Sequence, residues 1–225
     1  MNAKIAVAVL VAVLLSGCAT MLSLDRPFPT QPQVPADVIS KLAASEIQKL
    51  QVYVSSRVRY YDASNVMELA KKARQEEKPS ISFTEKFPVL LDPPVGSAMV
   101  ASAAKIIATI KTILGNRGYR ITDVPCEECL IVLLDYAEYW KIEKVTFRNQ
   151  RTLYSFARAR FYYGGQEVAV GRSDWFKGWA EGLIPIGPKM DDIITNVAEE
   201  AINETLQVFT QRMASWKQRV SSSIQ

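Results

Sequence analysis

The stretch Leu130-Ile131-Val132-Leu133-Leu134 decides the fold of this chain. Five consecutive apolar residues have the length of one strand, and an apolar run without polar alternation is typical of a strand covered on both faces. We therefore predict that residues 130–134 form the central strand of a sheet. The segments on either side must then supply the strands that pair with it and the helices that cover it.

Helical and strand patterns alternate on the N-terminal side of this strand. Apolar spacing predicts three helices, over residues 37–49, 63–77 and 96–114. Ser64 or Asn65 is expected to cap the second helix and Pro79 to stop it, while the third is expected to end at Gly115-Asn116. Period-two alternation and apolar runs predict three strands, over residues 52–60, 81–91 and 118–122.

The C-terminal side predicts a hairpin followed by one long helix. Residues 152–163 and 168–170 alternate as strands, and Gly164-Gly165 between them is typical of a primed turn. Gly187-Pro188 opens a helix whose apolar positions recur every three or four residues as far as Trp216. The predicted class is therefore α/β (α+β): a mixed-sheet, two-layer sandwich with helices packed on the sheet and a long C-terminal helix.

The N-terminus carries a second informative stretch, Leu15-Ser16-Gly17-Cys18. One cation, Lys4, precedes an uncharged run over residues 5–15, which is the layout of a secretory signal peptide. Eleven residues span roughly 16 Å as a helix, about half of a ~30 Å hydrocarbon core, so a membrane span is disfavoured. The four residues resemble a bacterial lipobox.

This resemblance implies that Cys18 is lipidated after cleavage of the signal peptide, and two or three acyl chains would make a stable membrane anchor. Ala19 stands where the resembling lipoproteins carry Asp for inner-membrane retention, which implies an outer-membrane, periplasm-facing location. We divide the chain into a signal peptide (1–17), a lipidated Pro-rich tether (18–36) and a single domain (37–225). The alternative for the tether is packing on the domain through Phe28 and Val34.

Composition excludes several classes of function. The sequence has no histidine, so it cannot build a Ser-His-Asp or Cys-His catalytic device or a histidine-containing zinc site. Without the signal peptide, 26 Lys and Arg face 23 Asp and Glu, and no run of five cations appears, so nucleic acid is not an expected partner. We predict no catalytic residues, no metal site and no cofactor.

Cys126-Glu127-Glu128-Cys129 is the one short motif with possible chemistry. A thioredoxin-type pair normally precedes a helix, whereas this pair precedes a strand, and zinc would need two more ligands. In an oxidising periplasm we predict a Cys126–Cys129 disulfide that pins a turn, at about 2 kcal/mol by the chain-entropy model. A redox-sensing role is the alternative, because strain makes a tight disulfide more reducible.

Two aromatic groups are candidates for a binding surface: a loop with Trp175, Phe176 and Trp179, and the end of the central strand with Tyr136, Tyr139 and Trp140. Exposed aromatic residues form stacking platforms for sugars or hot spots for proteins. The competing interpretation is that they cover the core. Together the six residues are expected to line one surface or groove.

The expected function is a non-enzymatic, membrane-anchored envelope lipoprotein whose periplasmic domain binds another envelope protein, in assembly, secretion or maintenance. The order of elements over roughly residues 50–215 resembles the small α/β domains of outer-membrane lipoproteins that serve in envelope assembly or secretion, and this resemblance implies no particular site residues. A glycan- or peptidoglycan-binding lipoprotein is the alternative, with Trp140, Trp175 and Trp179 as stacking faces. A thiol/disulfide sensor is the third candidate.

Overall fold

The structure, a computed structural model, describes residues 30–46, 49–65, 68, 89–90, 97–145, 148–173, 176–181 and 190–222. The predicted signal peptide and Cys18 lie outside these ranges. Most of the helix predicted over residues 63–77 and of the strand predicted over 81–91 also lies outside them.

The described strands form one mixed sheet. In chain order they are β1 (Gln51–Asp62), β2 (Val89–Leu90), β3 (Arg120–Thr122), β4 (Leu130–Val145), β5 (Arg148–Tyr163), β6 (Gln166–Arg172) and β7 (Phe176–Glu181). Their order across the sheet is β2-β1-β4-β5-β6, with β3 beside β1 and β7 beside β5. The β1–β4 and β1–β3 pairs are parallel, and the other pairs are antiparallel. The predicted mixed sheet is confirmed.

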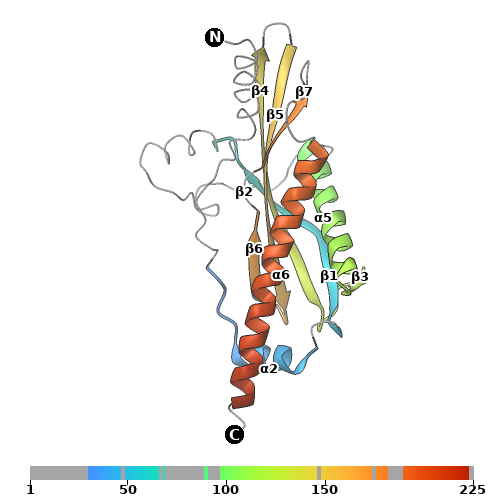
Figure 1. Ribbon diagram of the computed structural model, residues 1–225, viewed down its shortest axis with the longest axis vertical. Coiled ribbons are helices and arrows are strands. Elements are labelled where there is room, and N and C mark those ends of the chain that lie inside the picture. Colours follow the sequence, from blue (N-terminus) through green and yellow to red (C-terminus); the bar gives the residue numbers. More distant parts are fainter. Residues whose placement is uncertain are drawn as a thin grey trace, which may run out of the picture.

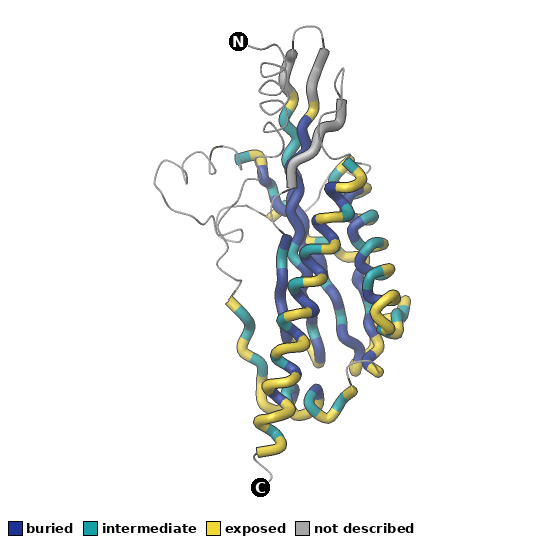
Figure 2. Tube along the Cα trace, in the orientation of Figure 1, coloured by how far each residue is buried: buried dark blue, intermediate teal, exposed yellow. Residues whose placement is uncertain are grey.

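Helices cover one face of this sheet. The described helices are α2 (Ala36–Ala44), α5 (Ala98–Asn116) and α6 (Met190–Ser222). In Figure 1, α5 and α6 run side by side along the sheet, with α5 against β1 and α6 against β5 and β6. Figure 2 shows buried residues along the strands and exposed ones on the outer sides of both helices. The α+β class with a long C-terminal helix is confirmed.

The central position of residues 130–134 is confirmed, because β4 lies between β1 and β5. The expectation that both faces are covered is wrong in part. Leu130, Val132 and Leu134 are buried in the core, whereas Ile131 is only half-buried. The described helices pack on one face of the sheet, and successive side chains of a strand point to opposite faces. Ile131 therefore points to the face that these helices do not cover.

The turn chemistry predicted for the hairpin is confirmed. Gly164 and Gly165 both have positive φ, +56° and +74°, as a primed two-residue turn requires. The predicted end of the third helix at Gly115-Asn116 is confirmed, since α5 ends at Asn116, but neither of these residues has a positive φ. The residue with positive φ is Gly118 (+85°), and the Tyr119 amide donates to the Leu114 carbonyl at 3.1 Å, which is the pattern of a Schellman motif.

The first helix ends five residues before its predicted end, at Ala44 instead of Lys49. Ser45 follows with extended backbone, and its hydroxyl donates to the Lys41 carbonyl at 2.9 Å. A serine that satisfies a carbonyl of the last turn favours termination. The chain then reaches Leu50, which is buried in the core.

The last part of the predicted tether is docked on the domain. The Gln31 side chain pairs with the β6 backbone: Nε2 donates to the Val170 carbonyl at 2.9 Å, and Oε1 accepts from the Val170 amide at 3.2 Å. The Arg212 guanidinium donates to the Pro32 carbonyl at 2.6 Å, and Val34 packs against the core. Residues 31–34 of the predicted tether therefore contact the domain, as the alternative interpretation expected for Val34, whereas Phe28 lies outside the described residues.

Candidate functional site

The two aromatic groups predicted from the sequence lie on strands that flank β5. On the β4 side, Tyr139 pairs with Tyr154 and Trp140 with Leu153. On the other side of β5, the prediction of a loop is wrong for residues 176–181, because they form strand β7. In this strand Phe176 pairs with Ser155 and Trp179 pairs with Thr152. Trp175 lies outside the described residues. We call residues 139–145 and 148–155 together with β7 the hairpin end.

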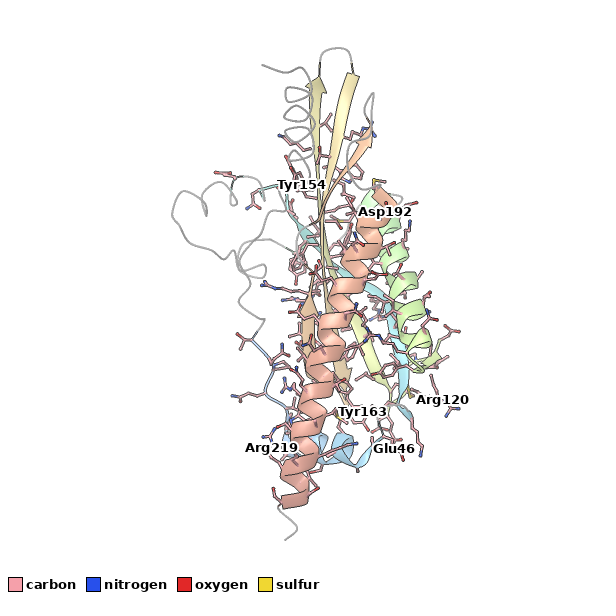
Figure 3. All side chains as sticks on the ribbon, viewed as in Figure 1. Glu46, Arg120, Tyr154, Tyr163, Asp192 and Arg219 are labelled. Carbon is pink, nitrogen blue, oxygen red and sulfur yellow. A yellow bond between two sulfur atoms is a disulfide. The ribbon has the colours of Figure 1, made fainter. Side chains whose placement is uncertain are left out.

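Two predicted surface residues of β4 lie at the edge of the core. Tyr139 and Trp140 are half-buried, and the Tyr139 ring lies 6.0 Å from the Tyr154 ring. Tyr154 is labelled at this end of the sheet in Figure 3. Tyr136 is fully buried, so its assignment to a binding surface is wrong. It lies on the face that the helices cover and belongs to the core.

Tyr136 is part of a buried polar network around Glu138. The Tyr136 hydroxyl donates to Glu138 Oε2 at 2.8 Å, Trp140 Nε1 donates to Glu138 Oε1 at 3.1 Å, and Ser155 donates to the Tyr136 oxygen at 3.0 Å. Burial raises the pKa of Glu138 above its ordinary value, although the hydrogen bonds from Tyr136 and Trp140 oppose the shift. The neutral donors orient the carboxyl group and satisfy both of its oxygens.

A second polar cluster, which the sequence does not reveal, surrounds Asp135. This side chain is 0% exposed and pairs with two arginines of β5. Arg158 Nε donates to Oδ2 at 2.8 Å, and Arg160 Nη2 donates to Oδ1 at 2.9 Å. Arg59 of β1 lies opposite Asp135 in the sheet. The alternation of Arg158 and Arg160 in the sequence was the available signal, but their carboxylate partner lies 23 and 25 residues away.

The predicted disulfide is present between Cys126 and Cys129. It closes the turn that precedes β4, where the Cys129 amide donates to the Cys126 carbonyl at 3.2 Å. Cys126 is exposed and Cys129 is buried. The amide oxygen of Gln51 lies 3.8 Å and 3.9 Å from the two sulfur atoms. The bridge therefore fixes the start of the central strand beside the start of β1.

The outer side of α5 is a surface that the sequence interpretation missed. Mean hydropathy over this helix reaches 1.5, which by length and composition alone would allow it to cross a membrane, yet only 28% of that window is buried. Along the middle of the helix the exposed residues are small: Ala101, Ala104, Ala108 and Thr112 follow one another at helical spacing. The scarcity of charge along residues 98–116 was the signal that could have revealed it.

Both lysines of α5 are paired with acids from neighbouring segments. Lys105 Nζ lies 2.5 Å from Asp191 at the start of α6, and Lys111 Nζ lies 3.3 Å from Asp123 after β3. These exposed pairs contribute little stability, but they offset the only formal charges on the helix. The outer side of α5 is therefore both apolar and electrically balanced.

Within the described residues, no group of three or more Cys, Asp and Glu side chains is placed to hold a metal ion. No protein-family model matches the chain, and no curated protein matches it. Among solved structures, a minor lipoprotein from Acinetobacter baumannii is similar over 51% of this chain and 87% of its own, with 9% identity and a TM-score of 0.32. An uncharacterized protein is similar over 74% and 94%, with 9% identity and a TM-score of 0.26.

Proposed function

We propose that this chain is a non-catalytic, lipid-anchored protein of the bacterial outer membrane whose periplasmic domain binds another envelope protein through the outer side of α5. The anchor rests on the sequence Leu15-Ser16-Gly17-Cys18 and the uncharged run before it. The tether leading from Cys18 to the docked residue Gln31 then holds the domain on the periplasmic side of that membrane.

The polar clusters of the described domain support a binding protein over an enzyme. Asp135 is held by two guanidinium groups, and Glu138 accepts hydrogen bonds at both oxygens. Groups engaged in this way stabilise the sheet and are not poised to exchange protons with a substrate. The absence of histidine from the sequence further limits the catalytic designs open to the chain.

The unburied apolar side of α5 is the observation that carries the proposal. A helix on the surface of a soluble domain normally presents charged residues to water. Here Ala101, Ala104 and Ala108 are exposed, and the two lysines of the helix are paired with acids. A row of exposed alanines with no unpaired charge beside it favours contact with a partner.

The size of these residues favours a helical segment as the partner's contact. Helices pack at interaxial distances of about 8 to 10 Å, and small residues in the contact allow the closest approach. Ala104 and Ala108 are four residues apart, so they lie on the same side of α5 in adjacent turns. A partner helix can lie along them without displacing a large side chain.

A photo-crosslinking amino acid at Ala104 or Ala108 tests this proposal in intact cells. We expect one discrete protein adduct from either position. Matched controls place the same amino acid at Gln207 and Gln211, which are exposed on α6. The variant Ala104→Arg should keep the fold, because arginine is a good helix former at an exposed position, and should abolish the adduct formed from Ala108.

The outcomes separate the candidate functions. An adduct formed equally from α6 positions, or none from α5, contradicts the proposed contact. An adduct that disappears after digestion of peptidoglycan would instead support the glycan-binding alternative. Loss of the adduct after reduction of the Cys126–Cys129 disulfide would favour the thiol/disulfide sensor, because reduction changes no residue of α5.

A further inference from the structure

The hairpin end projects beyond the rest of the sheet. β1 pairs with β4 only as far as the Asp62–Glu138 pair, and β6 pairs with β5 only as far as Arg158. Among the described strands, only β7 accompanies the segments beyond these points, where it reaches Arg151. Figure 1 shows β4 and β5 extending past α5 and α6 at the end of the molecule opposite α2 and the C-terminus.

This projecting part concentrates the positive charge of the chain. The hairpin end contains five cations, Lys141, Lys144, Arg148, Arg151 and Lys177, against two carboxylates, Glu143 and Glu181. Their net charge of +3 compares with +4 for the whole sequence. The hairpin end therefore accounts for most of the formal charge excess, which attracts an anionic surface.

One exposed apolar residue and two half-buried aromatic residues accompany these cations. Ile142 is 63% exposed, which is unusual for a β-branched residue in a strand, and Arg151 beside it in the register is exposed as well. Tyr139 and Trp140 follow towards the domain and are half-buried. Tyrosine and tryptophan at a boundary between cationic and apolar residues are typical of segments that lie in a membrane interface.

The length of the tether allows the hairpin end to meet the membrane that holds the anchor. Gln31 binds the backbone of Val170, and Val170 pairs with Arg160 of β5. The docked end of the tether is therefore level with Arg160, which is twelve residues along β5 from Arg148. At about 3.3 Å per residue this separation is about 40 Å. Thirteen residues connect Cys18 to Gln31, and at about 3.1 Å each in extended form they also span about 40 Å.

We propose that the hairpin end binds the anionic phospholipid headgroups of the anchoring membrane. The proposal rests on the lipid anchor proposed above. Lysine and arginine side chains bind lipid phosphates, and Ile142 enters the boundary between headgroups and acyl chains. Contact at this end directs the long axis of the domain away from the bilayer and leaves the outer side of α5 open along its length (Figure 1).

Vesicle sedimentation tests the proposal with the chain from residue 18 onward carrying Cys18→Ser, which removes the anchor and keeps every described residue. We expect binding to phosphatidylethanolamine vesicles that contain phosphatidylglycerol, weaker binding as salt rises, and none to phosphatidylcholine vesicles. The double variant Lys144→Gln with Arg148→Gln should lower the partition coefficient about 30-fold, at about fivefold for each cation near an anionic surface. Ile142→Ser should lower it severalfold.

The matched control neutralises two cations at the other end of the domain, Lys41→Gln with Lys217→Gln. Both residues are exposed, on α2 and near the end of α6, where Figure 3 labels Arg219. Unchanged binding of this control supports the assignment. Equal losses in both double variants, or no binding of the parent chain, would overturn it. The α5 crosslink should survive in the hairpin variant, so failure of membrane binding is distinguishable from failure of the proposed function.

Discussion

Replacing Gly171 with alanine tests the contact between α6 and β6. A Cβ atom at this position would lie 2.3 Å from the Thr205 amide nitrogen, 2.7 Å from the Thr205 hydroxyl oxygen and 2.8 Å from the Glu204 carbonyl carbon. The nearest atom belongs to the backbone of α6, so rotation of a side chain cannot relieve the clash. Restoring ordinary contact at 3.4 Å requires α6 to move away by about 1 Å.

This movement has two costs. Overpacking a core typically costs about 1 to 3 kcal/mol. The displacement also draws the Thr205 hydroxyl, which is shared between the Ala201 carbonyl at 2.7 Å and the Ala159 carbonyl at 3.1 Å, away from Ala159, and a buried polar group that loses a partner costs about 1 to 3 kcal/mol. We expect Gly171→Ala to lower the free energy of unfolding by about 3 kcal/mol. For a domain of this size that corresponds to a fall in Tm of about 6 to 12 °C.

Urea denaturation followed by circular dichroism measures this loss, and Gly115→Ala is the matched control. Gly115 lies in the last turn of α5, is exposed, and has no atom within 4 Å of the place that an added Cβ would occupy. The same chemical change should therefore stabilise the domain there, by up to about 1 kcal/mol, because alanine is the better helix former. A loss below about 1 kcal/mol for Gly171→Ala would refute the close approach of α6 to β6.

Two further predictions concern the buried carboxyl groups. Asp135→Asn should cost about 3 kcal/mol in urea denaturation, because Arg158 and Arg160 lose the charge that offsets their burial; a cost below about 1 kcal/mol would contradict this. Burial raises the pKa of Glu138, so the folded state binds its proton more tightly, and its contribution to stability falls as pH rises above the ordinary carboxyl pKa. The stability of the parent chain relative to Glu138→Gln should therefore decrease with rising pH, and a flat or rising difference would show that the carboxyl is not desolvated.

Local patterns predicted the parts of the fold whose cause is local. The positive φ angles at Gly164 and Gly165 follow from the needs of a two-residue turn, and the 3.6-residue apolar period gives α6. The apolar run over residues 130–134 located the central strand but not its end. β4 continues through Asp135 to Val145. Asp135 can be buried in this strand because Arg158 and Arg160 of β5 donate hydrogen bonds to its carboxylate.

By itself the sequence determined the class of fold, the lipobox-like stretch ending at Cys18 and the Cys126–Cys129 pair, since each depends on neighbours along the chain. Only the tertiary structure decided that Tyr136 is buried, that the aromatic segments flank β5, and that the outer side of α5 stays exposed. The physical reason is that register and burial depend on contacts between residues far apart in the chain, and a periodic pattern does not state which side of a helix will meet its neighbour.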